Sequence, residues 1–222
     1  MKTLGLIHTS PVLVGAFEAL VKEHVPGVAC FHMVDESLIK NTIRSGHLEK
    51  NTVRRLCAMV GSAIEAGAGT VLVTCSSIGP AVGVARQLFD TPIVRIDERM
   101  AETAVAAGTR VGVIATLPTT MDPTAGVIRD TAARLGREVT ITTRLCEGAF
   151  SAVVSGDTET HDRMVRAGLL DLSRSVDVVV LAQASMARVL QQIPEEERGC
   201  PFLISPPLAM KQVAEIMQPE KP

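Results

Sequence analysis

Short apolar runs rich in β-branched residues alternate along the chain with longer stretches in which apolar residues recur at helical spacing. Runs with so few polar positions are typical of strands buried on both faces of a parallel sheet. They predict strands at 3–8, 28–34, 70–74, 92–96, 110–114, 139–143, 176–181 and 201–204. The amphipathic stretches predict helices at 11–23, 49–66, 81–88, 121–135, 161–173 and 207–217. Regular alternation of strand and helix favours an α/β fold.

An internal repeat divides this pattern into two similar halves. Three segments of the first half match three of the second, with Leu4 corresponding to Val111, Cys75 to Gln183 and Pro92 to Pro201. Because order and spacing hold along the chain, we expect an N-terminal lobe at 1–106 and a C-terminal lobe at 107–222. In an alternative arrangement, the C-terminal helix packs back on the first lobe. Ligands of open α/β sheets bind at the carboxyl ends of the strands, so we expect the active site in a cleft between the lobes.

Composition narrows the range of functions. Hydrophobic residues make up 46% of the 222 residues, which is enough for a real core, and the net charge of −2 gives no reason to expect nucleic acid or an anionic membrane as partner. With no Trp or Tyr and five Phe, the chain has little to stack on bases. No apolar stretch reaches the roughly 18–20 residues of a membrane span, and the first residues resemble a strand more than a signal peptide. We therefore expect a cytoplasmic protein that binds a small polar ligand.

The cysteines predict neither disulfides nor a metal site. There are five, at wide spacings and without a C-x-x-C pair. Cys30 and His32 share one face of a strand but lack a third ligand, so no metal is expected. The glycine-rich stretch at 61–69 has no phosphate-loop lysine, which disfavours a nucleotide. His161 and Asp162 fall in a polar helix and are expected to be solvated.

Cys75 stands apart because it directly follows a buried strand and precedes a helix that begins near Pro80. A thiol at a helix N-terminus feels the positive end of the helix dipole and the nearby N–H groups, which lower its pKa. The same N–H groups can hold a carboxylate. A thiolate beside a carboxylate can remove the proton from the adjacent carbon or add to an activated double bond. The other four cysteines are interpreted as structural.

Polar residues follow the other strands at the same predicted edge. Their hydroxyl groups can hold a carboxylate without carrying charge, or simply cap the helices. His8 ends the first strand and is the best-placed histidine, as an acid–base group or as a hydrogen-bonded structural residue. The candidate substrate-binding residues are Thr9, Ser10, Ser76, Ser77, Thr116, Thr119, Thr120, Ala184 and Ser185.

The repeat, the Thr74-Cys75-Ser76-Ser77 turn and the segment Ala115–Thr120 together resemble the aspartate/glutamate racemase superfamily, over essentially the whole chain. The resemblance implies two flavodoxin-like lobes, a small carboxylate substrate, no cofactor and often a homo-oligomer. Racemases of this superfamily generally carry one cysteine in each half, one to remove the α-proton and the other to return it. Maleate isomerase and arylmalonate decarboxylase belong to the same superfamily.

The second cysteine of this pattern is replaced by Gln183, whose amide can donate and accept hydrogen bonds but cannot transfer a proton near neutral pH. Three chemistries remain: addition of Cys75 to an unsaturated diacid with bond rotation, single-thiol acid–base isomerisation or carbon–carbon cleavage, and proton supply by another group such as His8. The main hypothesis is a cofactor-independent isomerase with Cys75 as base or nucleophile and Gln183 orienting the substrate. The alternatives are a decarboxylase or lyase, and a non-catalytic protein that binds a small acid.

Overall fold

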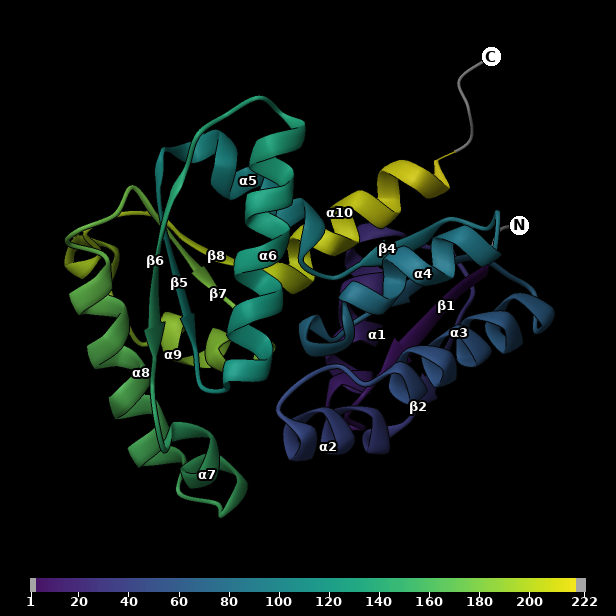
Figure 1. Ribbon diagram of the computed structural model, residues 1–222, viewed down its shortest axis with the longest axis horizontal. Coiled ribbons are helices and arrows are strands. Elements are labelled where there is room, and N and C mark those ends of the chain that lie inside the picture. The colour runs from purple at the N-terminus through teal and green to yellow at the C-terminus, as the bar shows by residue number, and fades with distance from the viewer. Residues whose placement is uncertain (1–2, 219–222) are drawn as a thin grey trace. The chain divides into compact units, whose positions relative to one another are not determined.

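A computed structural model describes residues 3–218, and contacts group the chain into two compact units, Met1–Ile96 with Pro206–Pro222, and Asp97–Ser205. Each unit contains a four-stranded parallel sheet with helices on both faces (Figure 1). The predicted α/β class, with two similar parallel sheets flanked by helices, is thereby confirmed.

The sheet of the first unit has the strand order β2-β1-β3-β4. Its strands are β1 (Thr3–His8), β2 (Cys30–Val34), β3 (Ala68–Val73) and β4 (Ile93–Arg95). Its helices are α1 (Leu13–His24), α2 (Glu36–Ser45), α3 (Lys50–Glu65), α4 (Pro80–Leu88) and α10 (Ser205–Met217). Leu6 lies in register with His32 on β2 and with Leu72 on β3, which brings the ends of β1 and β3 to one edge of the sheet.

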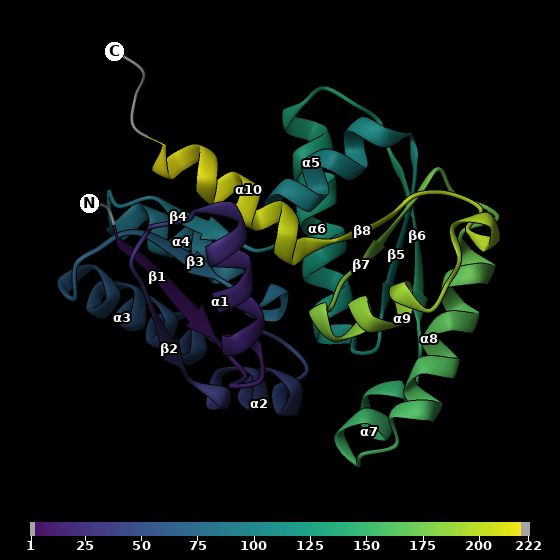
Figure 2. The same ribbon diagram turned by 180° about the vertical axis from the view of Figure 1, so that it is seen from behind.

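Alternation along the strands places a core on each face of this sheet. Leu4 and Leu6 of β1 pack with α1 and α10, through residues such as Phe17 and Met210. Ile7 points the opposite way and packs with the buried residues of α3 and α4. The C-terminal helix therefore belongs to the core of the first unit, on the same face as α1 (Figure 2).

The second unit repeats this topology with the order β6-β5-β7-β8. Its strands are β5 (Arg110–Ala115), β6 (Thr140–Leu145), β7 (Val178–Leu181) and β8 (Phe202–Ile204). Its helices are α5 (Glu98–Ala107), α6 (Pro118–Arg134), α7 (Ala149–Val154), α8 (Thr158–Leu172) and α9 (Ala187–Gln191). Ile114 and Leu181 pack with α8 and α9, and alternation turns the buried Val111 and Val113 to the opposite face, where α5 and α6 pack on each other.

All eight predicted strands occur within a few residues of their expected positions, but four helices were missed. Local signals existed for α2: Asp35 caps it by accepting a hydrogen bond from the Ser37 N–H, and Gly46 ends it in the left-handed conformation. The expectation of strands buried on both faces was wrong for β6, which lies at a sheet edge with most residues exposed.

None of the helices described within residues 3–218 is both long and apolar enough to cross a membrane.

Candidate active site

Cys75 lies two residues beyond β3, at the start of a single 3₁₀ turn, η1 (Ser76–Ile78), that leads into α4. Its side chain is half-buried. The donor groups that act on the sulphur and lower the pKa of the thiol are the Thr9 hydroxyl, the backbone N–H groups of Ser77 and Ile78, and the Ser77 hydroxyl. The end of β1 and the turn after β3 therefore enclose the thiol with neutral donors.

The pKa of the Cys75 thiol differs from the sequence-based expectation. Burial raises the pKa of the Cys75 thiol above its ordinary value of 9.0, although each hydrogen bond, from Thr9 first, acts to lower it. The expected lowering of the pKa was wrong because burial outweighs the donors. The N–H groups expected to hold a substrate carboxylate include two that point at the sulphur. At neutral pH the resting group is a thiol with a proton to give.

Gln183 occupies the matching place in the second unit, two residues beyond β7 and before the 3₁₀ turn η2 (Ala184–Met186). Its Oε1 accepts hydrogen bonds from the Thr116 backbone N–H at 2.6 Å and from the Thr116 hydroxyl at 2.9 Å. The amide nitrogen has no hydrogen-bond partner among residues 3–218. Since the oxygen is fixed, the orientation of the amide is fixed, and its N–H donors are available to a ligand.

The two positions are equivalent in conformation as well as in sequence. Backbone angles φ and ψ are −129° and 117° at Cys75, and −132° and 135° at Gln183. In each unit the threonine after the first strand, Thr9 or Thr116, donates a hydrogen bond to the residue after the third strand. An amide carbonyl in the second unit therefore receives the same kind of hydrogen bond as the thiol in the first.

His8 is fully buried in the first unit. Its Nδ1 lies 2.9 Å from Thr74 Oγ1, and its Nε2 lies 2.8 Å from Nδ1 of His32, whose ring is nearly coplanar with it. Burial, and then the neighbouring His32, lower the pKa of His8 from 6.5 to about 4. With both nitrogens engaged and the ring neutral, His8 has the environment of a positioning residue, and its acid–base role stays a sequence-based prediction.

The remaining candidates differ in exposure. Ser76, Ser77 and Thr120 are buried, Ser10 and Ala184 are half-buried, and Ser185 is exposed. The Thr119 hydroxyl is buried without a partner among the described residues, in the first turn of α6. The structure thus brings Thr9 and Ser77 to Cys75, and Thr116 to Gln183, whereas substrate contact by the others stays a prediction.

Arg95 was missed by the sequence analysis because it is distant from Cys75 along the chain. It ends β4, is only 9% exposed and packs on Gly79 of the Cys75 turn. A Cβ atom added at Gly79 would lie 2.8 Å from Cζ of Arg95 and 3.0 Å from the Ser76 carbonyl oxygen. Glycine is therefore needed at position 79 for close packing.

The Gly79→Ala substitution is expected to destabilise the protein by about 1–3 kcal/mol, because the guanidinium or the turn must move. Urea unfolding measures the change. Gly83→Ala in α4 is the matched control: nothing lies within 4 Å of its added Cβ, so a gain of about 0.5–1 kcal/mol is expected. Equal effects of the two substitutions would contradict the packing described for Gly79.

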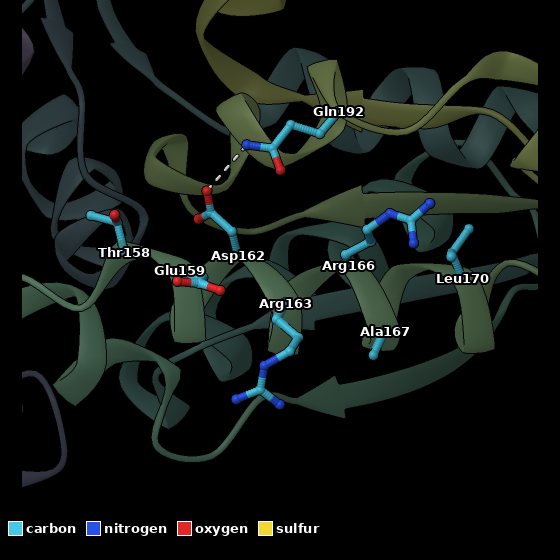
Figure 3. Close-up of a pocket in the computed structure, with 8 residues that line it drawn as sticks. All are labelled: Thr158, Glu159, Asp162, Arg163, Arg166, Ala167, Leu170 and Gln192. Carbon is cyan, nitrogen blue, oxygen red and sulfur yellow. Dashed lines mark hydrogen bonds between the residues drawn. The ribbon is translucent and has the colours of Figure 1, made fainter.

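The second unit also contains a pocket of about 650 Å³ beside α8 and α9 (Figure 3). Its lining includes Asp162, which receives hydrogen bonds from Arg188 at 2.7 Å and from Gln192 at 3.2 Å. His161 donates from Nδ1 to Asp162 at 2.7 Å and is fully buried, so the expectation that it is solvated was wrong. None of the candidate site residues lines this pocket.

The other four cysteines lack the donor set of Cys75. Burial raises the pKa of each of them, and no side-chain hydroxyl hydrogen-bonds their sulphur atoms. Within residues 3–218 no cluster of three or more His, Cys, Asp or Glu could hold a metal ion. Cys75 is therefore distinguished by its hydrogen bonds rather than by the direction of its pKa.

Comparisons with known proteins show where this fold occurs elsewhere. In solved structures the fold recurs in glutamate racemase from Thermus thermophilus in complex with β-chloro-D-alanine (16% identity, 97% of this chain and 80% of that chain, TM-score 0.73). It also recurs in an aspartate racemase homologue from Pyrococcus horikoshii (15% identity, 97% of this chain and 99% of that chain, TM-score 0.69). A third example is allantoin racemase from Klebsiella pneumoniae (15% identity, 98% of this chain and 87% of that chain, TM-score 0.67).

No curated protein matches the sequence. The family model described as Asp/Glu/hydantoin racemase matches residues 5–213, which include both Cys75 and Gln183. The chain therefore belongs to the Asp/Glu/hydantoin racemase family, a family of isomerases.

Proposed function

We propose that this protein is a cofactor-independent enzyme of the isomerase family that removes and returns a proton at the carbon next to a small carboxylate, with Cys75 as its proton-transferring thiol. The observation that carries the proposal is the equivalence of Cys75 and Gln183. Each follows the third strand of its unit in the same conformation and each receives a threonine hydrogen bond.

In the proposed step, the Cys75 thiol first gives its proton to water, and the resulting thiolate takes the α-proton of the substrate. The C–H bond breaks, its electron pair spreads into the carboxylate to form an enediolate, and an S–H bond forms. The fixed N–H donors of Gln183 would hydrogen-bond the negative oxygens without adding charge. Because the pKa of Cys75 is raised, its thiolate is a strong base. The Thr9 hydroxyl stabilises that thiolate and so limits the rise of the pKa.

Gln183 limits the stereochemical outcome, since an amide cannot deliver a proton. A single thiol removes and returns a proton on the same face of the carbon. We therefore expect α-hydrogen exchange with retention of configuration for amino acid substrates.

Decarboxylation is the second candidate, favoured by the raised pKa of Cys75. In that reaction a carbon–carbon bond breaks, carbon dioxide leaves and the electron pair stays on the α-carbon. The thiol then protonates that carbon and regains its own proton from water. A group that is a thiol at neutral pH suits this role, because the proton is already in place.

We also propose that the enzyme acts in the cytoplasm as a homo-oligomer, on a free small carboxylate rather than on nucleic acid or a membrane. The five free cysteines support the cytoplasmic location and the net charge of −2 argues against polyanionic partners, whereas the homo-oligomer is what the family resemblance implies. Light scattering of the purified chain measures its assembly state.

Incubation in D₂O with L- and D-aspartate, L- and D-glutamate, allantoin and methylmalonate tests the proposal. Proton NMR is expected to show loss of the α-hydrogen signal for one enantiomer of one amino acid, without appearance of the other enantiomer. Release of carbon dioxide from methylmalonate would instead support the decarboxylase. Absence of both reactions across the panel would contradict the proposed function.

Replacing Gln183 by cysteine is expected to make racemisation appear, at a rate well above the wild-type background. The Thr116 N–H and hydroxyl that now bind Oε1 would stabilise a thiolate at this position. Chiral chromatography of the same amino acids measures the gain. Gln192→Cys, a substitution on the other side of α9, is the control and is expected to gain nothing.

A further inference from the structure

Four groups form a continuous hydrogen-bonded chain inside the first unit. The Thr74 hydroxyl lies 3.1 Å from the Ile7 carbonyl oxygen, and a carbonyl only accepts, so Thr74 is the donor. Thr74 Oγ1 must then accept from Nδ1–H of His8 at 2.9 Å. His8 Nε2 is left as an acceptor and receives Nδ1–H of His32 at 2.8 Å.

The direction of each bond fixes the protonation of both rings. His8 must be the neutral Nδ1–H tautomer, because protonation at Nε2 would set an N–H group against that of His32. Nε2 of His32 is buried and has no hydrogen-bond partner among residues 3–218, so its protonation would leave these hydrogen bonds intact. These hydrogen bonds therefore require that Nε2 of His8 carries no proton.

Two members of this series of hydrogen bonds, His8 and Thr74, are the sequence neighbours of Thr9 and Cys75. His8 precedes Thr9, and Thr74 precedes Cys75. The Thr74 backbone N–H also binds the Ile7 carbonyl, at 3.0 Å, so the ends of β1 and β3 are joined by backbone and side-chain bonds together. Across these same ends, the Thr9 hydroxyl acts as a donor toward the Cys75 sulphur and lowers the pKa of the thiol.

We infer that His8, held by His32, is a positioning residue for Cys75: its bond to Thr74 fixes the two strand ends so that the Thr9 hydroxyl meets the thiol sulphur. The inference deepens the proposed function and rests on it, since it concerns the reactivity of Cys75. His32 thereby acquires a role distinct from the metal ligation that the Cys30–His32 spacing suggests.

The surroundings keep His8 in the required state. Phe17 of α1 covers its ring at a centroid distance of 5.4 Å, and burial lowers its pKa to about 4. Glu18 on α1 acts to raise the pKa of His32, whose pKa burial lowers. Asp35, after β2, binds the His8 carbonyl through its backbone N–H, and its carboxylate pairs with Arg55. Above about pH 5, His8 therefore stays neutral.

The rate of Cys75 alkylation by iodoacetamide against pH, followed by mass spectrometry of the peptide, tests the inference without any substrate. Thr74→Val removes the hydroxyl that accepts the hydrogen bond from His8. It is expected to raise the pKa of Cys75, and to slow labelling at pH 8 roughly tenfold, because the thiolate loses the stabilising hydrogen bond from Thr9. Thr70→Val is the matched control, because Thr70 is a buried threonine of β3 whose hydroxyl donates to the Gly69 carbonyl.

Histidine variants provide the rescue. His8→Leu is expected to act as Thr74→Val does, whereas His8→Asn, whose Nδ2–H can replace Nδ1–H, is expected to restore the wild-type profile. An unchanged profile in Thr74→Val, or equal profiles for the Leu and Asn variants, would overturn the inference. If the profiles shift as expected while the D₂O panel shows no turnover, the proposed function fails and the positioning role stands.

Discussion

Substitution of Cys75 by serine is expected to lower the rate of α-hydrogen exchange by roughly 10²- to 10⁴-fold, the usual contribution of a positioned acid or base. A serine hydroxyl nearly matches the thiol in size and can accept the same hydrogen bonds from Thr9, Ser77 and Ile78. It cannot act as a base near neutral pH. The fold and ligand binding should therefore survive while turnover is lost.

Cys30→Ser is the matched control, since Cys30 is also half-buried in the first unit but receives no hydroxyl hydrogen bond. Initial rates of deuterium incorporation, with urea unfolding curves for both variants, separate a chemical effect from a folding effect. A Cys75→Ser enzyme with the wild-type rate would exclude Cys75 from the reaction.

Acid is expected to weaken the fold through His8, by roughly 3 kcal/mol in total between pH 7 and pH 4. The pKa of His8 is about 4 in the folded protein and 6.5 in the unfolded chain. Between these values the unfolded chain binds the proton and the folded protein does not, so the free energy of unfolding falls as the pH falls. Each pH unit in this window costs about 1.4 kcal/mol.

Urea unfolding of wild type and His8→Asn at pH 7, 5.5 and 4 measures this contribution, because the asparagine variant has no titrating group at position 8. Wild type should lose roughly 3 kcal/mol relative to the variant across this range. His47→Asn removes an exposed histidine and should keep the wild-type slope. Parallel loss of stability in wild type and His8→Asn would show that His8 does not titrate in this window.

Much of this architecture could be predicted from the sequence because each strand and most long helices carry a strong periodic pattern. The repeat predicted the equivalence of Cys75 and Gln183, which the backbone angles of the two residues match. The helix α5 was missed because its alanine-rich sequence contrasts little with its surroundings, and α9 because it has only five residues.

The electrostatics of the site could not be predicted in the same way. The dipole argument for Cys75 omitted the burial cost, which depends on side chains from β1 and on the packing of the whole unit. The link between His8 and His32 depends on the register of β1 and β2, in which Leu6 lies opposite His32. The sequence shows both histidines but not the hydrogen bond between their rings.

The most direct test of the central claim, a Cys75 thiol beside a carboxylate-binding site, compares iodoacetate with iodoacetamide as labels of Cys75. The two reagents differ by a carboxylate in place of an amide. The proposed site predicts that labelling of Cys75 by iodoacetate saturates with reagent concentration, is favoured over iodoacetamide relative to the same ratio at Cys30, and is slowed by added small carboxylates. Labelling that rises linearly, with the same reagent ratio at Cys75 and Cys30, would contradict the claim.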